Sequence, residues 1–445
     1  MILPTRRALW SAAAVSLIGL LGVRVPGAFD AMLLTDVALV AVIWLDAMRS
    51  VRPGTRALTV EREAPPAYSV GRAGEVVYRW INRSRRSVRL RAREVRPDLL
   101  GGLQAPRSLA VGGDSEFSER LPVEPVRRGR TRSGEGEGGG AFVIDSRGPL
   151  GLGMRRGWLA LPWDVVVYPP LVSARLRASV AEARRRREPG VTPVRRLGEG
   201  RLFESLREWV PGDDVRNIDW KATGRRGKVI ARQYEAERRQ QVLLVLDTGR
   251  LLTGEIAGVS RLDYVVQAAL ELAYAAVQHD DNVGVMAFAD GVQHFVPPQR
   301  GRVALRRVLD VLTVVEPTLV EPDYPGAFRY LAVRNRKRAL TVLFTDIIDR
   351  MASEALVAHV ATLRPRHLPL AVTLRNPELD AVAGLRPVRP EDGFRKAAAE
   401  ELLRAREEAL AHIRRAGVLV LDVAPQRAAQ AVVASYLDLK RRGRL

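Results

Sequence analysis

From residue 241 onward, short apolar runs alternate with longer helical stretches, and this rhythm constrains the fold more than any other feature. The apolar runs are continuous, which is typical of strands buried on both faces of a parallel sheet. The stretches between them are long enough for the crossovers that parallel strands require. We therefore predict a doubly wound parallel α/β sheet. Its strands are expected at 241–247, 282–289, 340–346, 368–374 and 417–423, and its helices at 260–279, 301–313, 352–364, 391–416 and 426–441.

Two aspartates, Asp247 and Asp346, end apolar runs of this sheet. Right-handed crossovers bring the carboxyl ends of parallel strands to one edge, where α/β proteins bind ligands. An Asp after the first strand and a Thr-Asp pair after a later one resembles the von Willebrand factor A fold. In that fold a D-x-S-x-S motif, a loop Thr and a later Asp bind a divalent cation. Here the residues after Asp247 are Thr-Gly-Arg-Leu, so both serines are lost.

The resemblance implies a degenerate Mg²⁺ site at this edge. Its candidate ligands are Asp247, Thr248, Asp323 and Asp346. Mg²⁺ prefers about six oxygen ligands in strict geometry, so the loss of two hydroxyls predicts a weakly bound ion at most. We expect no other cofactor. In the alternative interpretation, Asp247 caps the following loop or pairs with Arg250.

The segment from 195 to 247 alternates acids and bases around Trp209, Ile218 and Trp220. An unpaired buried charge is costly, so the pattern predicts a semi-buried network packed against the α/β domain. In this network the three apolar side chains are at least partly buried, and the acids pair with Arg207, Arg216 and Arg225. The alternative is a solvated, salt-bridged connector that leads into the first core strand.

This segment resembles the signature of a bacterial family known only as domain-of-unknown-function family 58. The signature reads R-x-G-x-G-x-E-F-x-x-L-R-E-Y-x-P-G-D-D-x-R-x-I-D-W-K-A-[ST]-A-R-x-G, and the chain follows it from Arg196 to Gly227. Three positions depart mildly from it, with Leu202 for Glu, Trp209 for Tyr and Gly224 for Ala. The resemblance implies these interaction residues: Arg207, Glu208, Gly212, Asp213, Asp214, Arg216, Asp219, Trp220, Lys221 and Arg225.

Members of that family commonly occur beside AAA+ ATPases of the MoxR type. The resemblance therefore implies an ATPase partner and a non-enzymatic adaptor that acts in protein assembly or maturation. No Walker motif, H-E-x-x-H motif or recognisable Ser-His-Asp set appears, and the chain has no Cys. The competing hypothesis is a metal-dependent hydrolase that uses Asp247 and Asp346.

Two apolar stretches open the chain, Ala8–Val23 and Met32–Met48. Each is slightly shorter than the ~20 residues that span a bilayer, and a cleaved signal peptide is the alternative for the first. A second stretch directly behind the first favours a transmembrane helical hairpin. Basic residues flank its outer ends, which predicts a cell-membrane protein with its main domains in the cytoplasm. These residues are Arg6, Arg7, Arg49, Arg52 and Arg56.

Between 57 and 170 the sequence contains short β-forming segments separated by Gly- and Pro-rich turns, which predicts a small β-sandwich. The glycine tract 134–140 is expected to be a loop. The predicted organisation is a helical hairpin over 1–52, a sandwich over 55–172, a basic linker over 173–200, and the signature segment with the α/β domain over 201–445.

The formal net charge is +21. Such an excess suits an anionic lipid bilayer, nucleic acid or an acidic protein, and it also follows from a genome rich in Arg codons. The basic residues are dispersed and no nucleic-acid-binding motif is evident, so we do not expect a nucleic-acid partner. Nucleic-acid binding remains the third hypothesis for function.

Overall fold

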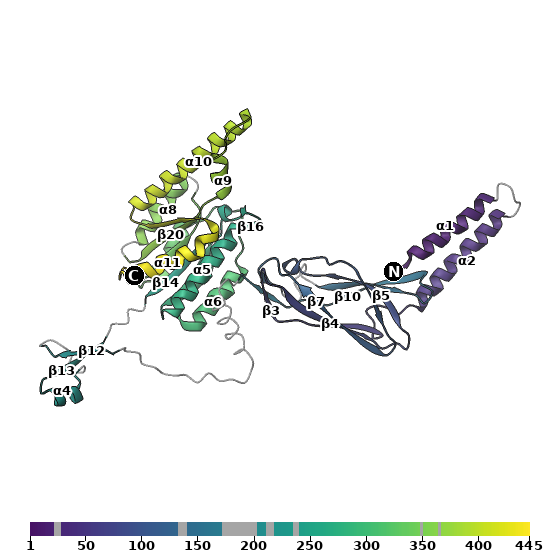
Figure 1. Cartoon of the computed structure of the whole chain (residues 1–445), viewed down its shortest axis with the longest axis horizontal. Coiled ribbons are helices and arrows are strands. Elements are labelled where there is room, and N and C mark those ends of the chain that lie inside the picture. The colour runs from purple at the N-terminus through teal and green to yellow at the C-terminus, as the bar shows by residue number, and fades with distance from the viewer. Residues whose placement is uncertain are drawn as a thin grey trace. The chain divides into compact units, whose positions relative to one another are not determined.

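In the computed structural model, the described residues are 1–21, 28–131, 140–170, 203–210, 218–234, 240–347, 350–363 and 366–445. The chain divides into two compact units (Figure 1). The first comprises Met1–Val172 with Leu312–Val315, and the second comprises Ser173–Val311 with Glu316–Leu445. The predicted glycine loop and the predicted basic linker fall largely outside the described residues.

The first unit begins with two helices, α1 (Arg6–Leu21) and α2 (Ala28–Arg49), which pack along one another (Figure 1). Within α2, the segment Phe29–Arg49 is long and apolar enough to cross a membrane. Helix α1 has 16 residues and falls short of the ~20 that a span needs. Among the described residues, the structure therefore contains one helix of spanning length where the sequence predicted two.

The first unit also contains two antiparallel sheets and one mixed sheet, and one strand, β1, precedes the two helices in the chain. Their strand orders are β1-β10-β9-β5-β6, β2-β4-β7 and β3-β11-β8. The elements are β1 (Ile2–Pro4), β2 (Leu58–Glu63), β3 (Ala67–Ser69), β4 (Gly74–Asn82), β5 (Val88–Val95), η1 (Asp98–Leu100), β6 (Arg107–Val111), β7 (Ser115–Val123), β8 (Gly129–Arg130), β9 (Ala141–Arg147), β10 (Gly153–Ala160) and β11 (Val166–Tyr168).

Alternation of side chains places one face of each sheet in a shared core. In β5, Val88, Leu90 and Ala92 are buried while the arginines between them are exposed. Across the core, the ring of Phe142 meets the edges of Tyr78 at 5.1 Å and Trp80 at 5.3 Å, measured between centroids. Two sheets packed face to face over aromatic side chains make this region a β-sandwich, as the sequence predicted.

The second unit is built on a six-stranded sheet in the order β18-β17-β14-β19-β20-β21. All its neighbouring strands are parallel except β18, which runs antiparallel to β17. The strands are β14 (Gln241–Asp247), β17 (Asn282–Phe288), β18 (Val292–Arg300), β19 (Leu340–Phe344), β20 (Leu368–Leu374) and β21 (Leu419–Val423). The helices are η3 (Arg250–Leu252), α5 (Arg261–Gln278), α6 (Gly301–Val314), α7 (Tyr324–Arg334), α8 (Arg350–Leu363), α9 (Pro377–Ala383), α10 (Pro390–Arg415), η4 (Pro425–Arg427) and α11 (Ala428–Arg441).

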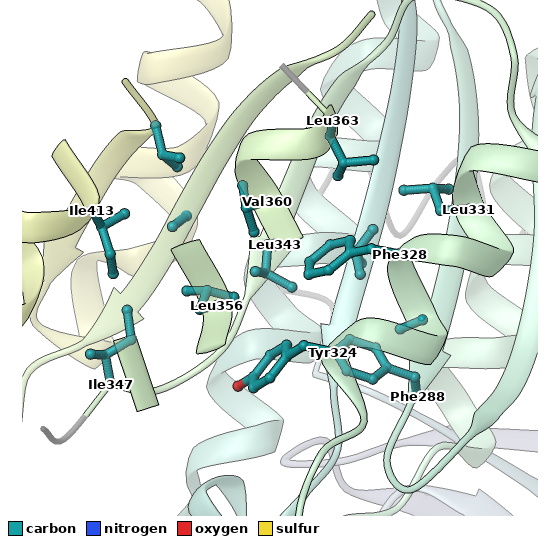
Figure 2. Close-up of a cluster of buried hydrophobic side chains, with 14 of the residues drawn as sticks. Phe288, Tyr324, Phe328, Leu331, Leu343, Ile347, Leu356, Val360, Leu363 and Ile413 are labelled. Carbon is teal, nitrogen blue, oxygen red and sulfur yellow. The ribbon is translucent and has the colours of Figure 1, made fainter. Parts of the chain in front are cut away.

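Helices cover both faces of this sheet. On one face, side chains of α7, α8 and α10 pack on the central strands, and Phe328 and Leu343 lie near the middle of that cluster (Figure 2). On the other face, α5 contacts β14 and β17, and α11 packs against α5 and β21. Burial on both faces explains the continuous apolar runs of the sequence. A short hairpin, β15 (Glu255–Ile256) with β16 (Val259–Ser260), precedes α5.

The signature segment forms a small module of its own elements. Strand β12 (Phe203–Glu208) pairs with β13 (Ile230–Tyr234), and α4 (Trp220–Arg226) lies between them in sequence. Asp219 caps the helix by accepting a hydrogen bond from the Ala222 amide, and Gly227 ends it in the left-handed conformation. The backbone amide of Ile230 donates to the Thr223 hydroxyl at 3.0 Å, which fixes the helix against the hairpin.

Candidate functional site

The candidate site lies at the carboxyl edge of the parallel strands. In chain order the strands run 3-2-1-4-5-6 across the sheet, so the direction of winding reverses between β14 and β19. Ligand crevices of doubly wound sheets lie outside such a reversal point. Asp247 ends β14, and Thr345 and Asp346 follow β19, the next strand across the sheet. The structure thus places the two aspartates at the carboxyl ends of adjacent strands, at the reversal point.

The Asp247 carboxylate accepts three hydrogen bonds from the protein. Its Oδ2 accepts hydrogen bonds from the Tyr324 hydroxyl at 2.8 Å and the Thr345 hydroxyl at 2.7 Å, and its Oδ1 accepts from the Gly249 amide at 2.8 Å. The carboxylate is buried, and burial raises the pKa of Asp247 against the lowering effect of these hydrogen bonds. Burial also raises the pKa of Tyr324 well above its ordinary value.

Asp346 is clamped by two arginines from different helices. Arg406 of α10 donates to Oδ1 at 2.8 Å, and Arg261, the first residue of α5, forms an ion pair with Oδ2. The Ile347 amide donates to Oδ1 at 3.0 Å. Both guanidinium groups also donate to the Leu374 carbonyl at the end of β20. The charge of Asp346 is therefore neutralised inside the protein, and the two helices are tied to two strands.

The network continues across the sheet to Asp422 on β21. Its Oδ1 accepts from Arg406 at 3.1 Å and from the Thr373 hydroxyl at 2.9 Å, and its Oδ2 accepts from Arg375 at 2.9 Å. Burial alone would raise the pKa of Asp422, but Arg406 and the other donors hold it below its ordinary value. Largely buried carboxylates thus connect three parallel strands at one edge through the buried Arg406 and the exposed Arg375.

A pocket of 650 Å³ opens beside this network. Arg406, Asp346 and Asp422 lie in its wall, and leucines of α9 and α10 form its apolar part, among them Leu379 and Leu402. A concave site with an apolar wall and a few converging charged groups is typical of a binding site for a ligand or a partner side chain.

The other two candidate metal ligands, Thr248 and Asp323, form hydrogen bonds with the backbone. The Thr248 hydroxyl donates to the Phe288 carbonyl at 2.9 Å, and Asp323 caps α7 by accepting from the Gly326 amide at 2.9 Å. Within the described ranges, no group of three or more His, Cys, Asp or Glu side chains is arranged to hold a metal ion. The four candidates therefore lie near one edge, but each is already engaged by protein donors or acceptors. Weak Mg²⁺ binding stays a prediction.

The signature residues are only partly described. Gly212, Asp213, Asp214 and Arg216 lie outside the described residues, as does the side chain of Arg207. Within the described part, Glu208 pairs with Lys228 at 2.8 Å, and the Arg225 side chain bonds to the Lys221 carbonyl at 3.3 Å. The packing of this module against the α/β domain stays a prediction.

Trp220 corrects one expectation. Trp209 and Ile218 are partly buried, as predicted, but Trp220 is 68% exposed. It is the first residue of a seven-residue helix, and the helix buries Ala222 rather than Trp220. The hairpin and one short helix offer too little surface to cover a second indole. Trp220 is therefore available for contact.

Sequence reasoning missed most of the groups that surround the two aspartates. Tyr324, Thr345, Arg261 and Arg406 come from four elements spread over 146 positions, from 261 to 406. Only Thr345 carried a signal, because it directly precedes Asp346 in the predicted strand.

The order of the strands and the helices on both faces of the sheet define a doubly wound α/β domain. Residues 205–421 match the family described as "Protein of unknown function DUF58". The resemblance to family 58 that the sequence indicated is therefore confirmed over these residues.

Relatives of the chain occur in mycobacteria. They include "Uncharacterized protein Rv1480" of Mycobacterium tuberculosis (strain ATCC 25618 / H37Rv) and "Uncharacterized protein Mb1516" of Mycobacterium bovis. Each is 26% identical over 274 residues, which cover 58% of this chain and 82% of the relative.

Two solved structures of the CARDB domain of PF1109 from Pyrococcus furiosus also match. The crystal structure, a complex with di-metal ions, is 17% identical and covers 25% of this chain and 86% of that one, with a TM-score of 0.18. The solution structure is 15% identical and covers 25% and 94%, with a TM-score of 0.17. These scores are too low to support a conclusion about fold or metal binding.

Proposed function

We propose that the protein is a membrane-anchored, cytoplasm-facing adaptor whose α/β domain binds a MoxR-type AAA+ ATPase. We assign that domain to the von Willebrand factor A-like class. The strand order and the aspartates at the reversal point support this assignment. The adaptor acts in protein assembly or maturation and carries out no chemistry itself.

The clamp of Arg261 and Arg406 on Asp346 carries the proposal. A metal-dependent hydrolase needs carboxylates that are free to bind a cation and activate water. Here two guanidinium groups neutralise the Asp346 carboxylate, and the Asp247 carboxylate already accepts three hydrogen bonds from the protein. Such an edge is rigid and charge-balanced, which suits recognition of a protein surface better than catalysis.

Anchoring by a hairpin of α1 and α2 is part of the proposal. Trp10 and Trp44 are 77% and 50% exposed, and each lies within about one and a half turns of arginines at the helix ends that adjoin the sandwich. Tryptophans near basic residues are typical of membrane interfaces. A reporter fused after residue 60 should therefore give a cytoplasmic signal, and an external signal would overturn this topology.

The adaptor is tested by affinity purification of the full chain from native membranes. We expect a MoxR-type AAA+ ATPase to co-purify with the wild type and to be depleted with Asp346→Ala, which disturbs the recognition edge. Arg404→Ala, on the exposed side of α10, is the matched control and should retain the ATPase.

The hydrolase hypothesis predicts a different set of results. It requires stoichiometric Mg²⁺ or Mn²⁺ binding in calorimetry, with phosphatase activity that Asp346→Ala abolishes. Those two results together would overturn the adaptor hypothesis in favour of the hydrolase hypothesis.

A further inference from the structure

A second cavity, of 470 Å³, lies in the first unit where α2 meets the sandwich. Four arginines line it together with Ser50 and Ser87, and none of the acidic side chains that the structure describes does; the arginines are Arg49, Arg86, Arg89 and Arg147. In the described part of the chain, none of the four arginine side chains forms an ion pair or hydrogen bond with another side chain. We call it the arginine cavity.

Two of these arginines face each other across the sheet. Arg89 of β5 and Arg147 of β9 are direct antiparallel partners, and both side chains are exposed. Like charges directly opposite one another destabilise a sheet. An anion between them would turn this repulsion into two charge-assisted hydrogen bonds.

Asp46 of α2 fixes the position of the cavity. Its carboxylate is buried and accepts hydrogen bonds at 2.8 Å from the amides of Leu150 and Leu152 in the β9–β10 turn and of Gly153 at the start of β10. A Cβ at Gly148 would clash with the Asp46 backbone carbonyl, so glycine is needed for this close approach. The turn therefore holds Arg147 beside Arg49 at the end of α2.

The cavity also lies at the C-terminal end of the apolar helix α2. Arg49 is the last residue of the segment long enough to cross a membrane. The exposed Trp44 precedes it by five residues, about 7.5 Å along a helix axis. A headgroup at the level of the interfacial tryptophan would thus lie within reach of Arg49.

We propose that the arginine cavity binds a phosphate group, that of an anionic phospholipid headgroup. Arginine forks match phosphate oxygens in bidentate geometry, and the two serine hydroxyls add donors. The lipid source rests on the proposed membrane anchoring of α2, whereas affinity for phosphate rests on the cavity alone. Free phosphate shares the chemistry, and the experiment separates the two sources.

The test uses the full chain in nanodiscs of phosphatidylcholine with increasing phosphatidylglycerol, and native mass spectrometry counts retained lipids. We expect selective retention of phosphatidylglycerol. The double variant Arg89→Gln/Arg147→Gln should weaken it at least about tenfold. Arg91→Gln/Arg93→Gln removes the same charge from the same face of β5 outside the cavity, and should weaken it less than about threefold. In parallel, calorimetry titrates inorganic phosphate into the detergent-solubilised chain.

The outcomes distinguish a headgroup site, a site for free phosphate and general attraction to the membrane. Loss of lipid in the first double variant alone, without phosphate binding in detergent, supports a headgroup site. Phosphate binding in detergent that the same variant removes supports the cavity with free phosphate as its ligand. Equal losses in both double variants, or no preference for the anionic lipid, would overturn the site in favour of general attraction between a basic surface and a membrane. Co-purification of the ATPase does not depend on these residues, so the two proposals fail separately.

Discussion

Arg406 donates to Asp346 through Nη1 at 2.8 Å, and this contact joins helix α10 to the end of strand β19. The same guanidinium reaches Asp422 on β21 through Nη2 at 3.1 Å. The Asp346 and Asp422 carboxylates and Arg406 are largely buried, and the attraction between them raises the pKa of Arg406 despite the opposing effect of burial. One side chain therefore couples the edge of the sheet to the wall of the adjoining pocket.

Arg406→Met should destabilise the α/β domain by about 3–5 kcal/mol, because it leaves buried carboxylates short of a cation. Thermal denaturation of the full chain, with hydrogen exchange at the ends of β19 and β20, measures the effect. Arg404→Met is the control, since Arg404 is exposed and pairs with Glu401 on the helix surface. Its effect should stay within about 0.5 kcal/mol. Equal effects of the two substitutions would mean that the clamp does not stabilise the domain.

The raised pKa of Asp247 predicts a pH dependence with a definite sign. A carboxyl whose pKa is higher in the folded than in the unfolded state stabilises the fold while protonated. That contribution is lost as pH rises from the unfolded value, about 3.9, through the folded one. The stability of the wild type relative to Asp247→Asn should therefore fall as pH rises above about 4.

Melting temperatures of wild type and Asp247→Asn at pH 4, 5, 6 and 7 measure this difference. Asn keeps one carbonyl oxygen for Thr345 and Tyr324 but presents an amide to Gly249, so a constant offset between the proteins is expected. A wild type that gains on the variant as pH rises would show that the hydrogen bonds outweigh burial at this carboxyl.

The sequence predicted the buried strands well because burial on both faces leaves a local pattern, a continuous apolar run. It missed β18, which contains Pro297 and Pro298. Proline removes a ladder hydrogen bond and argues against a central strand, but β18 is an antiparallel edge strand, where proline is tolerated. Helices α7 and α9 were also missed, since 11 and seven residues carry too little periodicity.

The site was less predictable than the fold. Position at a strand end identified Asp247 and Asp346, because topology brings such ends together. Nothing local indicated that Arg261 and Arg406 would clamp Asp346, since that pairing depends on how two helices pack on opposite sides of the sheet edge. The alternation of charges around Trp220 predicted that it is at least partly buried, but burial depends on a neighbouring surface that a short helix and hairpin do not supply.

The exposure of Trp220 predicts that binding and stability separate at this position. Trp220→Ala should change the melting temperature little, as surface substitutions usually shift stability by about 0.5 kcal/mol or less. Ile230→Ala, at a buried position of the same module, should cost about 2–4 kcal/mol locally. Hydrogen exchange of β12 and β13 reports both effects.

If the signature binds the ATPase, Trp220→Ala should also reduce the amount that co-purifies, because exposed aromatic side chains often carry interface energy. Loss of exchange protection in Trp220→Ala would instead show that the indole is buried in the folded protein. Normal protection with normal co-purification would assign partner binding to another surface.

Asp46→Ala should loosen the β9–β10 turn from α2. Three backbone amides would lose their acceptor, and each buried amide left unsatisfied costs about 1–3 kcal/mol, less where water enters. We expect the amides of Leu150, Leu152 and Gly153 to exchange much faster while the β4–β7 pairing stays protected. Asp46→Asn keeps one oxygen that can accept a hydrogen bond and replaces the other by an NH2 donor. Exchange of these amides in Asp46→Asn should therefore be intermediate between wild type and Asp46→Ala. Unchanged exchange in Asp46→Ala would mean that the turn holds its position, and that of Arg147, without the helix.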